Sequence, residues 1–408
     1  MRSLIVLKGL VKSQKLAWVK KERLGNFLLD IDTVKKLFYR PDYKGTKEYL
    51  IRSFDDVVYR VFIQSLCSRL STGTLIVVDM DNESLTSVED LAEIYGYTVF
   101  YHIEKTPRDY INRNIKYASN QFLPLQKDLL KREVDDFRHL DLSQKILIDT
   151  YEDVELYWKP LTKPITLNNT DPVLHISDLH SHWSILNNMI PPVEQFPLTV
   201  FAGDYIDGPE KGGSRLLMDQ ILNYENKNVI FLEGNHELRL RKFLGYIYLK
   251  GKGKKIVSEV LESELSTEFL EKTSKEFQGI RMLEAIEMIR NMNKTLKCFI
   301  SYQRGNNRYI CTHAGLRWLE QLSPKFIGNV IYSSKNVERV DKAFSDKYFP
   351  YNYWSIHGHC KYNEIDFFKF PGVINFDTED EWKVNYFINE ANNVQPNIFI
   401  LENEKDQN

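Results

Sequence analysis

Cysteine is scarce in this 408-residue sequence: there are four, widely spaced, with no C-x-x-C pair. This spacing excludes a cysteine-ligated zinc module and a disulfide scaffold, and it predicts free thiols in a reducing compartment. No apolar run approaches the length of about 18 residues that a membrane span needs. The N-terminus passes from MRS directly into LIVL without a cleavable signal. We therefore expect a cytoplasmic protein with no membrane partner.

A strong charge of either sign is also missing. The chain has 54 Lys and Arg against 56 Asp and Glu, a net charge of -2, so any contact with nucleic acid must come from local patches. Its 43% hydrophobic and 27% charged residues are typical of a globular protein. With 408 residues, the chain is longer than a domain that has a single hydrophobic core. We expect domains at 1–157 and 173–401. A proline-containing linker without regular structure should occupy 158–172, and a disordered tail 402–408.

Three apolar runs in the second half end abruptly in polar residues. They read VLHISDLHSHW, LTVFAGDYIDG and NVIFLEGNHE, the pattern of buried parallel strands that deliver polar groups at their carboxyl ends. The side chains of Asp178, His180, Asp204 and Asn235 should therefore converge. Carboxylate, imidazole and amide groups of this kind suit two divalent metals, with one carboxylate able to bridge them.

Two further histidines follow apolar runs nearer the C-terminus, His313 in YICTHAG and His359 in SIHGHC. The ordered series D-x-H, GD-x-x-D, GNHE, H-A-G and G-H resembles the calcineurin-like binuclear metallophosphoesterase superfamily. One such motif would be weak evidence for the family, but five motifs in this order are specific evidence. The resemblance implies an αββα sandwich with two divalent cations. Mn²⁺ is the expected metal, and Fe, Zn, Ni and Mg are the alternatives.

The resemblance also implies a role for each motif residue. Asp178 and His180 correspond to ligands of the first metal and Asp204 to the bridge, while the second metal takes Asn235, His313 and His359. His236 resembles the non-ligand histidine that protonates the leaving oxygen, supported by Asp207 or Glu237. Three more histidines lie beside the motifs without matching a ligand position, and we expect them in the core or in support of the ligands: His175, His182 and His357.

The phosphate-gripping arginine of many relatives is missing. Where they read GD-x-x-D-R-G, this chain has Gly208, and the replacements we consider are Arg215, Arg239 and Lys211. Asp377 in PGVINFDTED resembles an acidic residue with which the family shapes the site. Because the arginine contacts substrate, its absence leaves the substrate class open.

The first half alternates strand and helix, which predicts a doubly wound α/β domain. We expect strands at 4–7, 27–31, 74–80, 97–103 and 145–149, and helices at 47–68 and 86–95. The stretch KGLVKSQKLAW follows the first strand, where a phosphate-binding loop reads G-x-x-x-x-G-K-[ST]. This half is similar to the P-loop kinase domain of the polynucleotide 5'-kinase family, whose members are often fused to a phosphatase that heals 3' ends.

The kinase resemblance implies a set of nucleotide-binding positions: Gly9, Ser13, Lys15, Asp32, Lys35 and Arg113. Two of the loop's requirements are lost. Gln14 replaces the second glycine, and Leu16 replaces the hydroxyl that would hold Mg²⁺. We therefore expect kinase activity with ATP and Mg²⁺ to be absent or weak. The domain then serves stability, homodimerisation or substrate docking.

The segment 238–295 has helical periodicity throughout and predicts an all-helical insertion that forms a wall or cap beside the metals. Its beginning, LRLRKFLGYIYLKGKGKK, mixes basic and aromatic residues, which suits a nucleic-acid backbone and stacked bases; the alternative is a solvated helix face.

From the whole chain we expect a metal-dependent phosphoesterase acting on phosphomonoesters or cyclic phosphodiesters at RNA or nucleotide 3' ends. Hydrolases of phosphoproteins, dinucleoside polyphosphates or cyclic nucleotides are the alternatives. The remaining alternative is a protein without catalytic activity that serves as a nucleic-acid-binding scaffold.

Overall fold

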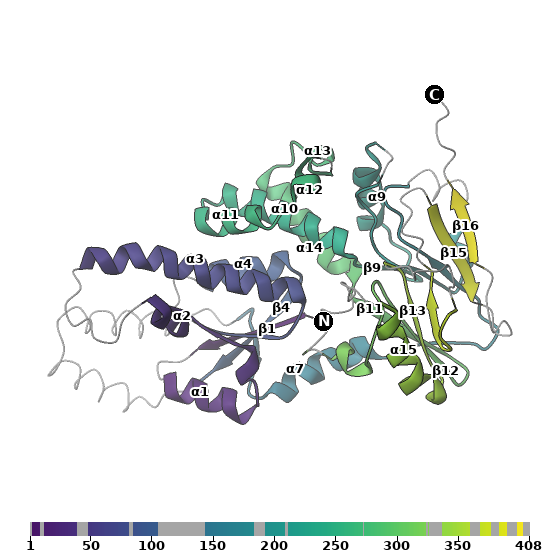
Figure 1. Ribbon diagram of the computed structural model, residues 1–408, viewed down its shortest axis with the longest axis horizontal. Helices are drawn as coiled ribbons and strands as arrows, with labels where there is room; N and C mark the ends of the chain where they lie inside the picture. Colours follow the sequence, from purple (N-terminus) through teal and green to yellow (C-terminus); the bar gives the residue numbers. More distant parts are fainter. Residues whose placement is uncertain are drawn as a thin grey trace.

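The computed structural model describes residues 2–8, 12–38, 48–80, 85–104, 143–182, 192–208, 211–271, 273–323, 325, 337–359, 368–376, 383–389 and 398–402. The N-terminal part contains a five-stranded parallel sheet in the order β2-β3-β1-β4-β5 (Figure 1). Its strands are β1 (Arg2–Lys8), β2 (Leu28–Asp30), β3 (Ile76–Asp79), β4 (Tyr97–Ile103) and β5 (Ile146–Ile148).

Side chains alternate between the two faces of this sheet, and helices cover both. On one face Leu4 and Val6 pack against α3 (Glu48–Thr72) and α4 (Leu85–Ile94). On the other, Ile5 and Leu7 pack against α1 (Lys12–Lys21) and α7 (Tyr151–Trp158). Helix α2 (Ile31–Phe38) follows β2. The predicted doubly wound sheet is confirmed. Its assignment as a P-loop domain stays a prediction, because residues 9–11 lie outside the described residues.

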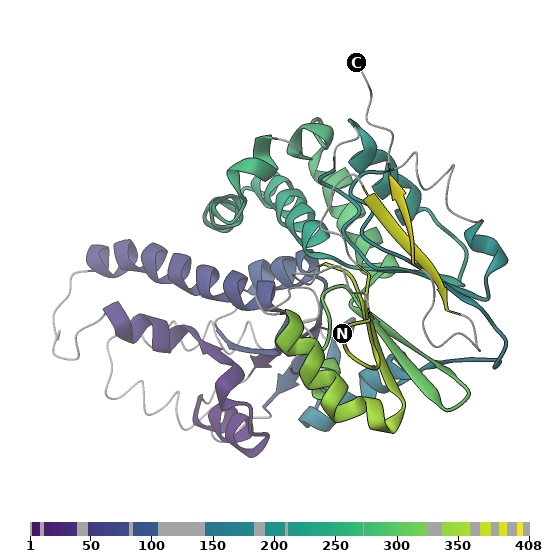
Figure 2. The same ribbon diagram turned by 45° about the vertical axis from the view of Figure 1, so that its right-hand side comes forward.

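Two sheets face each other in the C-terminal part. The first has the order β10-β9-β8-β7-β15-β16, with its last two strands at one edge (Figure 2). The second has the order β14-β13-β12-β11-β6. The first comprises β7 (Val173–Ile176), β8 (Leu198–Phe201), β9 (Val229–Leu232), β10 (Leu296–Lys297), β15 (Lys383–Asn389) and β16 (Ile398–Glu402). The second comprises β6 (Ile165–Leu167), β11 (Phe299–Arg304), β12 (Asn307–Thr312), β13 (Tyr353–His357) and β14 (Val373–Asn375).

An apolar core joins the facing sides of these two sheets, with Val200 and Leu232 opposite Tyr302 and Ile356. Helix α9 (Gly213–Leu222) packs outside the first sheet, and α15 (Val337–Tyr348) packs outside the second. This is the expected helix–sheet–sheet–helix arrangement.

The stretch 158–172 has more regular structure than expected. Residues Lys159–Thr162 form a 3₁₀ turn, and Ile165–Leu167 form β6, which pairs with β11 at the edge of the second sheet. Three residues are too few for a strand periodicity to stand out in the sequence. The stretch therefore contributes an edge strand, and the domain boundary drawn there stays a prediction.

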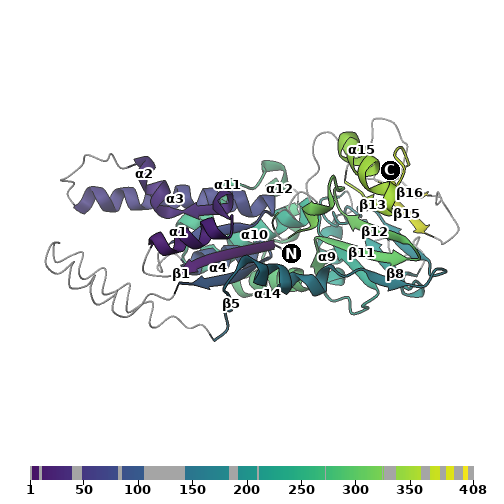
Figure 3. The ribbon, with the colours of Figure 1, turned by 90° about the horizontal axis from the view of Figure 1, so that it is seen from below.

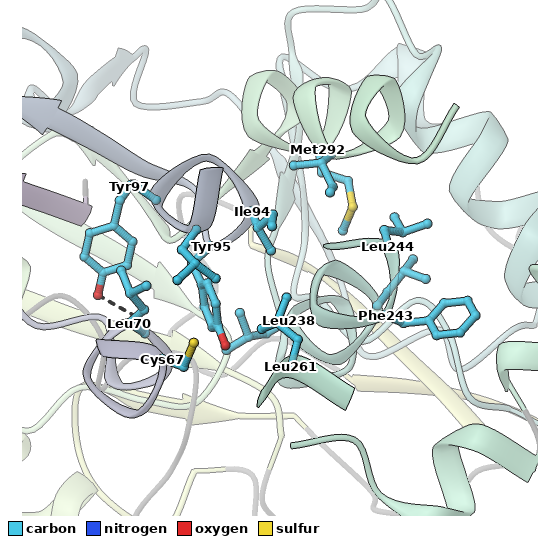
Figure 4. Close-up of a cluster of buried hydrophobic side chains, with 14 of the residues drawn as sticks. Cys67, Leu70, Ile94, Tyr95, Tyr97, Leu238, Phe243, Leu244, Leu261 and Met292 are labelled. Atoms are coloured by element: carbon cyan, nitrogen blue, oxygen red, sulfur yellow. Dashed lines mark hydrogen bonds between the residues drawn. The ribbon is translucent and has the colours of Figure 1, made fainter. Parts of the chain in front are cut away.

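The insertion is helical, as predicted, but it packs mainly on the N-terminal part. Its helices are α10 (Asn235–Gly251), α11 (Lys255–Ser263), α12 (Thr267–Glu271), α13 (Thr273–Glu276) and α14 (Met282–Thr295). Figures 1 and 3 show α10 and α11 alongside α3, and both α10 and α14 contact α4. Ile94 and Tyr95 meet Leu238, Leu244 and Met292 in one continuous buried cluster (Figure 4). One core therefore joins the two halves.

The basic aromatic start of the insertion belongs to this interface. Phe243 and Tyr248 are buried. Arg241 pairs with Glu233, Lys242 with Glu264 at 2.8 Å, and Lys252 with Asp90 at 3.0 Å. Arg241 and Lys242 are buried beside carboxylates and are not free to meet phosphates, whereas the side chain of Lys252 is 34% exposed. A nucleic-acid surface formed by the exposed members of this basic set stays a prediction. Among the helices within the described ranges, none is both long and apolar enough to cross a membrane.

Candidate metal centre

Both C-terminal sheets deliver polar side chains to one place. Asp204 follows β8, His313 follows β12, and His359 follows β13. One ligand atom from each of these three lies within 4.8 Å of the others. Asp204 Oδ2 is 3.3 Å from His313 Nε2 and 3.8 Å from His359 Nδ1. Because parallel strands of both sheets end here, residues more than a hundred positions apart share one small volume.

The other expected ligands surround this group. His313 Nε2 is 3.0 Å from Asn235 Oδ1, and His313 Nδ1 is 3.4 Å from Asp178 Oδ1. The backbone N–H of His359 donates to Asp178 Oδ2 at 3.0 Å. Within the described part of the chain, the buried Oδ1 of Asp178 accepts no hydrogen bond. A buried carboxylate oxygen without a donor is costly unless a cation faces it.

Backbone carbonyls orient two of the histidines. His180 Nδ1 lies 3.3 Å from Ile206 O, and His313 Nδ1 lies 2.8 Å from Ala202 O. A carbonyl at Nδ1 selects the tautomer with its proton there, which leaves the Nε2 lone pair for a ligand. The donor set, the orphaned carboxylate oxygen and these tautomers together fit a divalent-metal site.

Left-handed backbone gathers at this site. Among the residues described, seven non-glycines have positive φ, and five of them are His180, Ser181, Asp204, Asp207 and His359. Such conformations cost free energy in L-residues and concentrate at functional sites, where surrounding contacts impose them. Here the N–H groups of His180 and Ser181 donate to the carbonyls of Asp204 and Tyr205, both at 2.9 Å.

Close packing explains the missing arginine. A Cβ built on Gly208 would lie 1.4 Å from the carbonyl oxygen of His180, so no side chain fits this backbone. Gly234 is equally constrained, since its Cβ would lie 2.0 Å from Asp204 Oδ1. The loop after β8 is therefore built around glycine at the position where relatives carry arginine.

His236 sits beside this group with a carboxylate partner. Its Nδ1 is 2.6 Å from Asp207 Oδ2, and its Nε2 is 3.6 Å from Asp204 Oδ2. Burial lowers the pKa of His236, but the carboxylates of Asp204 and Asp207 outweigh burial and raise the pKa above its ordinary value. Its side chain is 18% exposed, so a substrate can reach it.

The carboxylate of Glu237 forms no hydrogen bond or ion pair with the ring of His236, both of which lie in the described part of the chain. Its carboxylate accepts the backbone N–H groups of Asp204 at 3.0 Å, Tyr205 at 2.8 Å and Gly234 at 2.9 Å. Burial, and then the charge of Asp204, raises the pKa of Glu237 to about 7. The structure thus places Asp207, and not Glu237, next to the histidine, while Glu237 joins the loops after β8 and β9.

The proposed phosphate-binding arginines differ in their surroundings. Arg215 pairs with Asp219 at 3.0 Å and Glu284 at 3.2 Å. Arg239 is half-buried on the first turn of α10, forms no ion pair with any residue described, and its charge acts to lower the pKa of His236. Asp377 lies outside the described residues.

The candidate nucleotide site of the N-terminal part is described in pieces. Lys15 forms an ion pair with Asp79 at the end of β3, and Asp30 Oδ1 accepts the backbone N–H of Asp32 at 3.0 Å. Ser13 lies in α1 and Lys35 in α2, whereas Gly9 and Arg113 lie outside the described residues.

The three extra histidines are buried, as expected. The partner of His357 was missed: its Nε2 lies 3.1 Å from both carboxylate oxygens of Asp341 on α15. Nothing in a helical sequence marks which aspartate will face a buried histidine.

Residues 171–376 match the calcineurin-like phosphoesterase family, and the chain belongs to that family of metal-dependent phosphoesterases. A comparison with curated proteins found no match. One solved structure, described as a "putative diadenosine tetraphosphatase", shares 16% identity with this chain, with a TM-score of 0.36. The match covers 59% of this chain and 98% of that one. This similarity is too low to bear on substrate.

Proposed function

We propose that the protein hydrolyses phosphate esters with two divalent cations. Asp178 and His180 would hold the first, Asn235, His313 and His359 would hold the second, and Asp204 would be shared by both. The position of Asp204 supports this role, because its Oδ2 faces His236, His313 and His359 within 3.8 Å. Mn²⁺ is the expected metal, with Fe, Zn, Ni or Mg as alternatives.

Bound cations of this kind polarise the phosphate and lower the pKa of water enough for attack at phosphorus. His236 supplies the proton for the leaving oxygen. Asp207 at 2.6 Å holds the Nδ1 proton and stabilises the imidazolium, so that Nε2–H is the proton to be donated. This pair is the observation that carries the proposal. A purely structural metal site would have no use for a partly exposed, carboxylate-supported histidine that is not a ligand.

Arg239 takes the place of the arginine that Gly208 excludes. It is half-buried, unpaired within the described chain and close enough for its charge to act on His236. A guanidinium so placed binds a phosphate oxygen by charge-assisted hydrogen bonds. Arg215, by contrast, already satisfies two carboxylates.

For the substrate we propose RNA or nucleotide ends carrying a 3'-phosphate or a 2',3'-cyclic phosphate. Support comes from the carboxyl edge of the doubly wound parallel sheet in the N-terminal part. Ligands of open α/β sheets bind at that edge. This half then docks the nucleic acid or the nucleotide, with little or no kinase activity.

The test is release of phosphate, with Mn²⁺ and with EDTA, from matched RNA oligonucleotides, a phosphopeptide and dinucleoside polyphosphates. We expect a Mn²⁺-dependent preference for RNA ends of more than about tenfold, which corresponds to about 1.4 kcal/mol. Preference for the peptide or the dinucleotide would leave the phosphoesterase intact and refute the RNA-end proposal.

Variants test the residue roles. Asp204→Asn should remove nearly all turnover on every substrate, whereas Lys255→Ala, whose side chain is 86% exposed, should not. His236→Ala should lose less rate on p-nitrophenyl phosphate than on an RNA end, because p-nitrophenolate leaves without a proton. Equal losses on both substrates would refute the acid role.

A further inference from the structure

A buried group of three charges lies where the two halves of the protein meet. Glu233 lies between β9 and Gly234, the residue before Asn235 and His236 begin α10. Its carboxylate binds Arg2 Nη2 at 2.8 Å and Arg241 Nε, and all three side chains are 3% exposed or less. Arg2 begins β1 of the N-terminal sheet, and Arg241 lies on α10.

The same arginines bind the turn between α4 and β4. Arg2 Nη1 donates to the carbonyl of Tyr95 at 2.5 Å, and Arg241 Nη1 donates to that of Ile94 at 3.5 Å. Arg241 also donates to Asn293 Oδ1 on α14. Strand β1, the α4–β4 turn, the β9–α10 loop and α14 are thus tied into one network.

Close packing leaves this network little freedom. Gly96 in the α4–β4 turn has φ +71°, and a Cβ there would lie 3.1 Å from Asn293 and 3.3 Å from Arg2. A buried ion pair keeps its geometry only while both partners stay in place, and removing one partner leaves the other charge buried without compensation.

The backbone that follows Glu233 is also constrained. The N–H of Glu233 donates to the carbonyl of Lys297 at 2.8 Å, and that of Gly234 donates to Glu237 at 2.9 Å. Gly234 packs against Asp204 with no room for a Cβ. Glu233 and Gly234 directly precede Asn235 and His236, so a displacement of the Glu233 backbone moves the start of α10.

We infer that the N-terminal half is a positioning part of the phosphoesterase centre: Arg2, acting through Glu233, holds Asn235 and His236 in place. The inference rests on the proposed function for the roles of Asn235 and His236. Arg2 is not among the proposed ligands, and its side-chain polar contacts are with Glu233 and the carbonyl of Tyr95. Its effect comes from geometry, since a misplacement of about 1 Å costs about 100-fold in rate.

The experiment compares Arg2→Met with Lys252→Met in the full chain. Methionine keeps the apolar stem and removes the charge. Lys252 is the control, because its pair with Asp90, at 3.0 Å, also joins the two halves but lies at the far end of α10, where the Lys252 side chain is 34% exposed. The readouts are kcat and KM on p-nitrophenyl phosphate with Mn²⁺, calorimetric Mn²⁺ affinity and the thermal midpoint.

Arg2→Met should lower the thermal midpoint, and Lys252→Met should lower it less, because a partly exposed ion pair contributes little to stability. Only Arg2→Met should lower kcat, by about tenfold or more with a much smaller change in KM, and weaken Mn²⁺ binding, because only it releases the loop. If Arg2→Met fails to fold, Arg2→Lys replaces it. Lysine keeps the charge but cannot contact Glu233 and the carbonyl of Tyr95 at the same time, so we expect a partial loss of kcat.

Equal kcat and equal Mn²⁺ affinity in the two variants would overturn the inference and leave the proposed function untouched. An inactive wild-type protein would instead refute the proposed function. The positioning role would then be decided by Mn²⁺ affinity alone, which must fall in Arg2→Met and not in Lys252→Met.

Discussion

Gly208→Ala tests whether the loop after β8 excludes the arginine of relatives for steric reasons. The added methyl group would lie 1.4 Å from the carbonyl oxygen of His180, whereas real contacts of this kind are not shorter than 3.0 Å. The loop must therefore move by about 1.6 Å to relieve the overlap. His180 is a proposed ligand, so the movement displaces the site itself.

The expected effect is larger on rate than on stability. Overpacking of this kind costs about 1–3 kcal/mol of the free energy of unfolding. A misplaced site costs about 100-fold in kcat for each ångström or so. We therefore expect Gly208→Ala to lose at least about 100-fold in Mn²⁺-dependent hydrolysis of p-nitrophenyl phosphate while remaining folded at assay temperature. Gly208→Arg, which restores the residue of relatives, should be equally inactive.

Gly25→Ala is the matched control. A Cβ at Gly25 meets nothing within 4 Å, and its backbone is not left-handed, so this variant should keep its rate within about twofold. Both proteins are assayed side by side, with circular dichroism to confirm folding. A near-normal rate for Gly208→Ala would refute the steric argument.

Three further predictions concern stability. Leu244→Ala, in the shared core, should lower the free energy of unfolding in urea by about 2–5 kcal/mol and leave a single unfolding transition. The control Leu283→Ala, at a side chain that is 71% exposed, should lower it by less than about 0.5 kcal/mol. Two separate transitions would contradict one shared core. Burial, and then the charge of Arg304, lowers the pKa of His175 to about 3. Below about pH 6.5 the unfolded chain therefore binds a proton at this histidine that the folded protein does not bind. The free energy of unfolding should then fall by at most about 1.4 kcal/mol per pH unit as the pH drops from about 6.5 toward 3. His175→Gln should flatten that dependence of the urea midpoint, and an unchanged slope would contradict the assignment. Asp341→Ala should lower the free energy of unfolding by about 1–3 kcal/mol, because the buried ring of His357 loses this hydrogen-bond acceptor. An unchanged urea midpoint would contradict this prediction.

Several elements could be predicted closely because their signals are local. The N-terminal strands are apolar runs between polar turns, and the structure has β3 within 74–80 and β4 at 97–103. The polar residues after β7, β8 and β9 converge as expected, since neighbouring parallel strands end at one edge.

Other features have no local signal. The short strand β6 depends on β11, more than a hundred residues away. The basic residues at the start of the insertion have the composition of a nucleic-acid surface, yet Arg241 and Lys242 face carboxylates inside an interface. Whether a cation is free or paired depends on what folds against it.

The sequence by itself determined most of the longer strands and helices, their order and the set of polar groups at the candidate centre, because periodicity and strand-end chemistry are properties of contiguous residues. Tertiary structure alone decided the left-handed backbone at Asp204 and His359, the steric need for Gly208, and the pairing of Arg2 with Glu233. Each of these results from contact between segments that are distant along the chain, and such contact leaves no pattern in either segment.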